Sequence, residues 1–175
     1  MSPRFRRQLG GYPLPVTDPR SLSTYLNDHL TAATAGLELF RRVARSHPGA
    51  RAEELGRLRD EAARDLESLR SVMGRLGVRE NKPMAALGWL GEKVGRLKPN
   101  GYLLRRSPLA DVIELEGLRV AAHGKLACWQ VLRAVAVHDE RITQVELETL
   151  IERTEDQATR LYKLHLQAVQ ERLLA

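Results

Sequence analysis

The chain has 175 residues, of which 43% are hydrophobic and 29% charged, with a formal net charge of +6, a composition typical of one soluble globular domain. The single cysteine, Cys128, excludes an intrachain disulfide and any zinc or iron–sulfur site built from several cysteines. No uncharged run approaches the ~20 residues of a transmembrane helix, and the basic first residues lack the apolar stretch of a secretory signal, so we expect a cytoplasmic protein.

The first 46 residues predict an irregular arm followed by a long helix. Residues 1–20 are rich in Gly, Pro and Arg, which favours an irregular basic N-terminal arm. Over 21–46, apolar and small residues recur at steps of three and four and therefore share one helical face. Ser21 or Ser23 is the expected N-cap of this helix, and Asn27 falls on its opposite face.

A second helix and a basic connection follow. The His-Pro-Gly sequence at 47–49 ends the first helix, and a second apolar stripe over 50–76 ends at Gly77. Residues 78–107 then lose this periodicity, except for a short amphipathic helix predicted over 83–97. This crossover carries an excess of positive charge from seven side chains: Arg79, Lys82, Lys93, Arg96, Lys98, Arg105 and Arg106.

Two further helices are predicted over 108–138 and 144–174. A Ser-Pro pair at 107–108 is the expected start of the third, which is apolar around most of its circumference. Two helical hairpins joined by a long crossover make the topology of the ferritin-like fold. We therefore expect an all-α, ferritin-like four-helix bundle over 21–175. Ala and Thr at inward positions also leave room for a small apolar cavity.

Two segments carry a resemblance to the ferritin-like family. Residues 26–33 read Leu-Asn-Asp-His-Leu-Thr-Ala-Ala, similar to the bacterioferritin-type pattern Leu-Asn-x-x-Leu-x-x-Glu, and residues 61–64 resemble the Glu-x-x-His of its second helix. The stretches YLNDHL, SPL…ELE and GK…W are also similar to a group of bacterial proteins with no established activity. The resemblance implies a bundle that, in the family, holds two irons with one Glu from each of two helices and a Glu-x-x-His pair from each of the others.

This sequence departs from that ligand set at most positions. Ala33 stands where the first helix needs Glu, Arg64 stands where the second needs His, and Ala158 follows Glu155 where the fourth needs His. No histidine of the chain has Glu three residues before it. The notional ligands that remain are carboxylates: Glu61, Glu114 and Glu155. We therefore expect that the di-iron centre has been lost and that no cofactor is bound.

The remaining carboxylates leave two interpretations open. In the first, Arg64 or Lys125 supplies the positive charge that iron supplies in the family, because a buried Glu114 would need a partner. In the second, a rearranged site binds iron or manganese through oxygen ligands. Its candidate ligands are all carboxylates: Glu61, Asp65, Glu114 and Glu155.

The histidines and the cysteine have simpler interpretations. His29 and His165 fall on core stripes and are secondary candidate ligands, but a lone histidine on an apolar face is more often a hydrogen-bonded core residue. Cys128, within an apolar helix, is expected to be an inert buried thiol.

Three functions follow from these observations. The leading hypothesis is a non-catalytic structural or interaction module that forms a homodimer. The first alternative is a carboxylate-rich metal-binding oxidoreductase or iron-handling protein. The second is a basic stress protein that binds nucleic acid through the crossover, whose charges would also suit an anionic membrane surface or a second subunit. A solvated basic face is the simpler interpretation of those charges.

Overall fold

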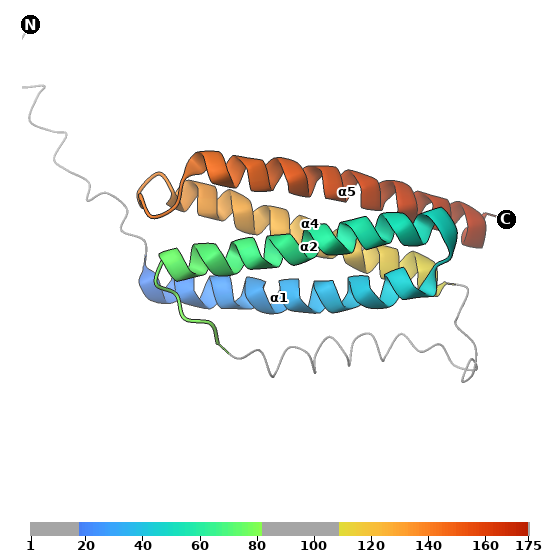
Figure 1. Cartoon of the computed structure of the whole chain (residues 1–175), viewed down its shortest axis with the longest axis horizontal. Coiled ribbons are helices and arrows are strands. Elements are labelled where there is room, and N and C mark those ends of the chain that lie inside the picture. The colour runs from blue at the N-terminus through green and yellow to red at the C-terminus, as the bar shows by residue number, and fades with distance from the viewer. Residues whose placement is uncertain (1–17, 82–108, 175) are drawn as a thin grey trace, which may run out of the picture.

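The computed structural model describes residues 18–81 and 109–174, and in these it contains four long helices and no strand (Figure 1). The helices are α1 (Pro19–Ser46), α2 (Gly49–Arg75), α4 (Ala110–Val135) and α5 (Gln144–Leu173). They are 26 to 30 residues long, so each spans roughly 40 Å. The predicted all-helical, four-helix arrangement is confirmed for this part of the chain. Most of the predicted arm and the predicted short helix over 83–97 lie outside the described residues.

The four helices pack as two antiparallel hairpins, α1 with α2 and α4 with α5 (Figure 1). The hairpins meet where α4 packs against α1 and α2 contacts α5. Helices α1 and α5 run one way along the bundle, and α2 and α4 run the other way (Figure 1). The end of α2 and the start of α4 therefore lie at opposite ends of the bundle, and the connection between them has to return the chain along its length.

The end of α2 follows from its sequence. Gly77, the predicted terminator, has a φ of +73°, a conformation that favours glycine. The amide of Gly77 donates to the Gly74 carbonyl (3.1 Å), and the amide of Val78 donates to the Met73 carbonyl (2.9 Å). These two bonds form a Schellman motif and satisfy carbonyls that would otherwise lack partners at the helix end.

The predicted N-cap of α1, Ser21 or Ser23, is wrong. The cap is Asp18, whose carboxylate accepts hydrogen bonds from the amides of Arg20 (3.1 Å) and Ser21 (3.3 Å). A carboxylate at the N-cap stabilises the helix more than a hydroxyl does here, because its negative charge also interacts favourably with the helix dipole. At the other hairpin, α4 ends at Val135, three residues before its predicted end at 138, and the predicted Ser-Pro start lies outside the described residues.

Asn27 is buried, although the sequence pattern placed it on the outer face of the first helix. Its Nδ2 donates to the carbonyls of Ser23 (2.9 Å) and Arg79 (3.1 Å), and its Oδ1 accepts from the amide of Asn81 (2.6 Å). Through these bonds Asn27 holds residues 79–81, which follow α2, against the side of α1. A polar residue is buried here because it satisfies backbone groups beyond the helix end.

The core consists of two apolar clusters, one towards each end of the bundle. The first includes Leu26, Leu69, Trp129 and Leu147, and the second includes Phe40, Leu58, Leu115 and Leu161. Between these clusters α2, α4 and α5 carry buried or half-buried polar residues: Asp65, Lys125, Thr154 and Gln157. A group of polar side chains from three helices therefore lies in the middle of the bundle.

Candidate functional site

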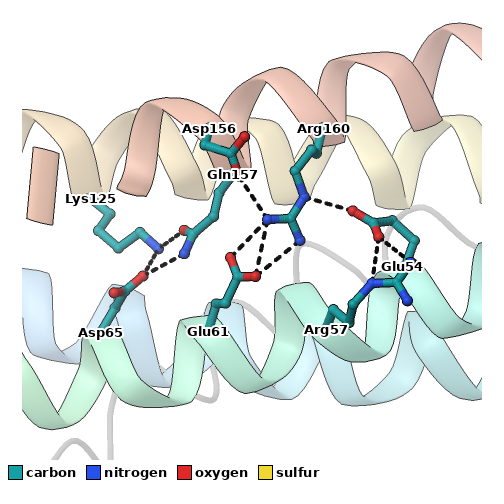
Figure 2. A network of polar contacts seen from close by, with 8 residues as sticks. All are labelled: Glu54, Arg57, Glu61, Asp65, Lys125, Asp156, Gln157 and Arg160. Atoms are coloured by element: carbon teal, nitrogen blue, oxygen red, sulfur yellow. Dashed lines mark hydrogen bonds and ion pairs between the residues drawn. The ribbon is translucent and has the colours of Figure 1, made fainter. Parts of the chain in front are cut away.

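A small polar network joins three helices in the middle of the bundle (Figure 2). Asp65 on α2 and Gln157 on α5 are almost fully buried, with 1% and 2% of their surface exposed. Lys125 on α4 donates through Nζ to Asp65 Oδ2 and to Gln157 Oε1. Gln157 Nε2 donates to Asp65 Oδ2 over 3.0 Å. Each side chain therefore holds the other two in place.

Asp65 also pairs with a second cation. Its Oδ1 forms an ion pair with Nη2 of Arg153, which lies one turn before Gln157 on α5. Burial lowers the pKa of Lys125, and the charge and hydrogen bond of Asp65 oppose that effect by favouring the ammonium form. Because the desolvation of buried ions offsets much of their attraction, we expect this network to specify which helix faces meet more than to add net stability.

A second polar network surrounds Arg160, one turn further along α5 (Figure 2). The guanidinium reaches three carboxylates: Glu54 at 2.6 Å, Glu61 at 3.0 Å and Asp156 at 2.8 Å. Burial alone would lower the pKa of Arg160, but these hydrogen bonds outweigh burial and raise it above its ordinary value. Arg57 pairs with Glu54 from the opposite side, at 2.6 Å.

Acid should weaken this second network. Burial alone would raise the pKa of Glu54, but hydrogen bonds from Arg160 and Arg57 outweigh burial and lower the pKa below its ordinary value of 4.5. A carboxylate with a depressed pKa in the folded state adds stability above its unfolded pKa, and that stability is lost as the pH falls through the folded pKa. We therefore expect the free energy of unfolding, measured by urea titration, to decrease below pH 4.5.

The Glu54→Gln variant should lose less stability over the same pH range than the unsubstituted chain does, because it has no carboxylate to protonate at that position. Glu53→Gln, an exposed neighbour, is the matched control and should keep the full pH dependence. If Glu54→Gln and the unsubstituted chain fall equally steeply, the role given to Glu54 is wrong.

The structure brings together only part of the predicted carboxylate set. Glu61 and Asp65 lie one turn apart on α2, and each is paired with cations from neighbouring helices. Glu114 on α4 has its carboxylate 3.4 Å from Nε of Arg42 on α1. Glu155 is exposed on α5. Among residues 18–81 and 109–174, no three His, Cys, Asp or Glu side chains are grouped so that they could hold a metal ion.

Of the two predicted charge replacements, Lys125 contacts a core carboxylate and Arg64 is exposed on α2. The carboxylate that Lys125 contacts is Asp65. Glu114, for which the sequence suggested Arg64 or Lys125 as partner, lies beside Arg42 instead. The sequence pattern could not show this, because Arg42 reaches Glu114 only where α1 packs against α4.

The remaining predicted side chains have packing roles. His29 is half-buried with its ring centroid 4.5 Å from that of Tyr25, and burial lowers its pKa. His165 accepts a hydrogen bond at Nδ1 from Arg119 Nη1, over 2.8 Å. Cys128 is buried, and burial raises the pKa of its thiol to about 12, as expected for an inert thiol.

The predicted basic surface lies mostly outside the described residues. Arg79 is described and exposed, and its carbonyl is bound by Asn27. The other six basic residues fall in the segment that is not described: Lys82, Lys93, Arg96, Lys98, Arg105 and Arg106. Binding of nucleic acid or of a membrane surface by this segment stays a prediction. None of the described helices combines the length and the apolar character needed to cross a membrane.

A largely apolar cleft of about 720 Å³ opens between α1 and α4 and reaches the central network. Small residues of both helices line it, among them Ala32, Ala33, Gly36, Gly117, Ala121 and Gly124. Buried residues of α2 and α5 also line it, among them Asp65 and Gln157, beside Lys125 of α4. The sequence suggested a small apolar cavity, whereas the structure has a larger apolar cleft that opens between two helices and has charged groups at its inner end.

No model of a known protein family matches this chain, and comparisons with curated proteins and with solved structures find no match either. Its function has to follow from the chemistry of its own residues.

Sequence reasoning missed several polar residues because their roles depend on helix packing. Arg153, Gln157 and Arg160 carry no local motif, and a polar residue every three or four positions is ordinary on a helix surface. A separate cluster at the end of the bundle was also missed. There His47 Nε2 lies 3.3 Å from Asp111 Oδ1, and Arg172 Nη2 lies 2.9 Å from Asp111 Oδ2.

Proposed function

We propose that this chain is a ferritin-like bundle that works without a metal ion, as a non-catalytic structural or interaction module. The observation that carries the proposal is the pairing of both core carboxylates of α2. Asp65 is held by Lys125 and Arg153, and Glu61 is held by Arg160. A divalent ion would need these oxygens as ligands, and binding it would require breaking the ion pairs.

The ferritin-like part of the proposal draws support from topology. The chain forms two antiparallel hairpins, and the long connection between them joins opposite ends of the bundle (Figure 1). One long crossover of this kind distinguishes ferritin-like bundles from bundles with short loops throughout. In such a bundle Lys125 and Arg160 supply positive charge, from α4 and α5, to Asp65 and Glu61. Glu61 is the position that the ferritin-like pattern assigns to an iron ligand.

The test is the metal content of the full-length protein. After anaerobic incubation with Fe(II), Mn(II) or Zn(II) and desalting, we expect elemental mass spectrometry to find far less than one ion per chain, because both carboxylates are already paired. Stoichiometric metal that disappears in a Glu61→Gln/Asp65→Asn variant would refute the proposal and support the carboxylate-rich metal site. Asp60→Asn/Glu67→Gln, two exposed carboxylates of the same helix, is the matched control.

A second copy of the chain is the partner that we propose for the module. Exposed apolar side chains on the outer face of α4 support this, since Val120 and Val131 are 67% and 41% exposed. A patch of this kind is more often covered in an assembly than left in water. Multi-angle light scattering of the full-length protein distinguishes a dimer from a monomer, and a concentration-independent monomer would refute the dimer.

A further inference from the structure

We propose that the cleft between α1 and α4 is a binding site for an elongated, uncharged apolar molecule that carries an oxygen acceptor, such as a carbonyl, at one end. This inference goes beyond the metal-free module proposed above and does not depend on it. Three properties of the cleft support it: its size and shape, the small side chains of its walls, and the donors at its inner end.

The size and shape suit a long, narrow ligand. The volume of about 720 Å³ lies within the range typical of small-molecule sites. The lining residues of α4 run from Ala110 to Trp129, which corresponds to roughly 30 Å of helix. Apolar walls on both sides make water a poor occupant, because water in such a space finds few hydrogen-bond partners.

Small side chains line the cleft at the level of Lys125. The two helices run antiparallel and approach closely at Gly36 and Ala121, where a Cβ added to Gly36 would lie 3.5 Å from the Cβ of Ala121. One turn further along each helix, Lys125 on α4 therefore lies level with Ala32 and Ala33 on α1. Both alanines line the cleft, and they occupy less of it beside Lys125 than larger side chains would.

The inner end of the cleft presents donors that need an acceptor. The ammonium group of Lys125 has three N–H bonds, and among the described residues the structure shows two acceptors for them, Asp65 and Gln157. Trp129 also lines the cleft, and its buried Nε1 has no hydrogen-bond partner within the described part of the chain. A buried donor without an acceptor is costly, so a ligand oxygen placed here would relieve that cost.

The same residues argue for an uncharged ligand. Lys125 and Asp65 already form an ion pair at the inner end of the cleft. An anionic head group would meet the carboxylate of Asp65, and a cationic head group would meet the ammonium group of Lys125. A neutral carbonyl accepts hydrogen bonds without either repulsion.

The test uses three probes with the same ten-carbon chain: 2-decanone, decanoate and decylamine. The protein is the full chain with Trp89→Phe, so that Trp129 is its one remaining tryptophan. We expect a saturable change in Trp129 fluorescence with 2-decanone, and at least about tenfold weaker binding of the charged probes, as expected for about 1.4 kcal/mol of discrimination. Absence of saturable binding of 2-decanone, or equal binding of the three probes, would overturn the proposal. The first of these outcomes would point to a cover for the cleft from within the protein or from a second copy.

A pair of variants on α4 locates the binding. Gly124 lines the cleft, and a Cβ added there meets no atom within 4 Å, so Gly124→Phe fills the cleft without a clash at its first carbon. Ala127 lies on the same helix, is exposed and does not line the cleft, so Ala127→Phe is the matched control. We expect Gly124→Phe to weaken 2-decanone binding by about tenfold or more, and Ala127→Phe to leave it within about twofold. Binding that responds equally to the two variants would refute the location, and circular dichroism checks that both remain folded.

Discussion

Replacing Asp65 with Leu is expected to lower the free energy of unfolding by about 3–5 kcal/mol, because removing one partner of a buried ion pair leaves charge without compensation. In the Asp65→Leu variant, Lys125 and Arg153 would face each other without the carboxylate that both contact. Gln157 would also lose the acceptor for its Nε2. Urea denaturation followed by circular dichroism measures the loss.

Two further variants show whether this loss comes from the buried network. Asp60→Leu removes an exposed carboxylate of the same helix, and we expect it to change stability by roughly 0.5 kcal/mol or less. The double variant Asp65→Leu/Lys125→Met replaces the ion pair with apolar side chains and should recover part of the loss, because such replacements are often close to neutral. If the effects of Asp65→Leu and Lys125→Met simply add, the two residues are not coupled as the structure indicates.

The second large effect is expected for Arg160→Met, which should lower the free energy of unfolding by about 2–4 kcal/mol. Arg160 is the shared partner of Glu54, Glu61 and Asp156, and hydrogen bonds that involve charged groups contribute about 1.5–3 kcal/mol each when buried. The expected loss of free energy is smaller than the sum of three such bonds, because the Arg160 side chain is 22% exposed and water screens part of the interaction.

A matched arginine tests this interpretation. Arg133 pairs with Glu148 between two exposed side chains, so Arg133→Met should cost at most about 1 kcal/mol. The loss in Arg160→Met should also shrink as the pH falls through the lowered pKa of Glu54, because protonated Glu54 no longer forms an ion pair with Arg160. Equal losses for Arg160→Met and Arg133→Met would show that the network around Arg160 contributes no more than an ordinary surface pair.

The helices could be predicted from sequence because their signals are local. Periodic apolar stripes depend only on the 3.6-residue repeat of the α-helix, and the stop at Gly77 depends on a backbone conformation that favours glycine. The cap of α1 was missed because residues 1–20 were assigned to an irregular arm, so only Ser21 and Ser23 were considered as caps. Asp18 caps the helix because α1 already starts at Pro19, a residue that suits the first helical position.

The candidate site could be predicted only in part. Glu61 was singled out by the resemblance of residues 61–64 to Glu-x-x-His, Asp65 as a further carboxylate close to the same stripe, and Lys125 as a source of positive charge in place of iron. Their partners were not predictable, since Asp65 and Gln157 are 92 residues apart and Glu61 and Arg160 are 99 apart. The sequence around a polar residue does not indicate which other helix its side chain will contact.

Two properties of this protein could be predicted from its residues alone: it is built from long amphipathic helices, and it contains no Glu-x-x-His pair. Both properties are local, because they follow from residue spacing along one helix. The packed helices were needed to show that Lys125 and Arg160 hold the α2 carboxylates, that Glu114 lies beside Arg42, and that a cleft between α1 and α4 reaches the buried network. These contacts depend on the relative rotation and register of packed helices, which are set by the joint packing of all their side chains and not by any one segment.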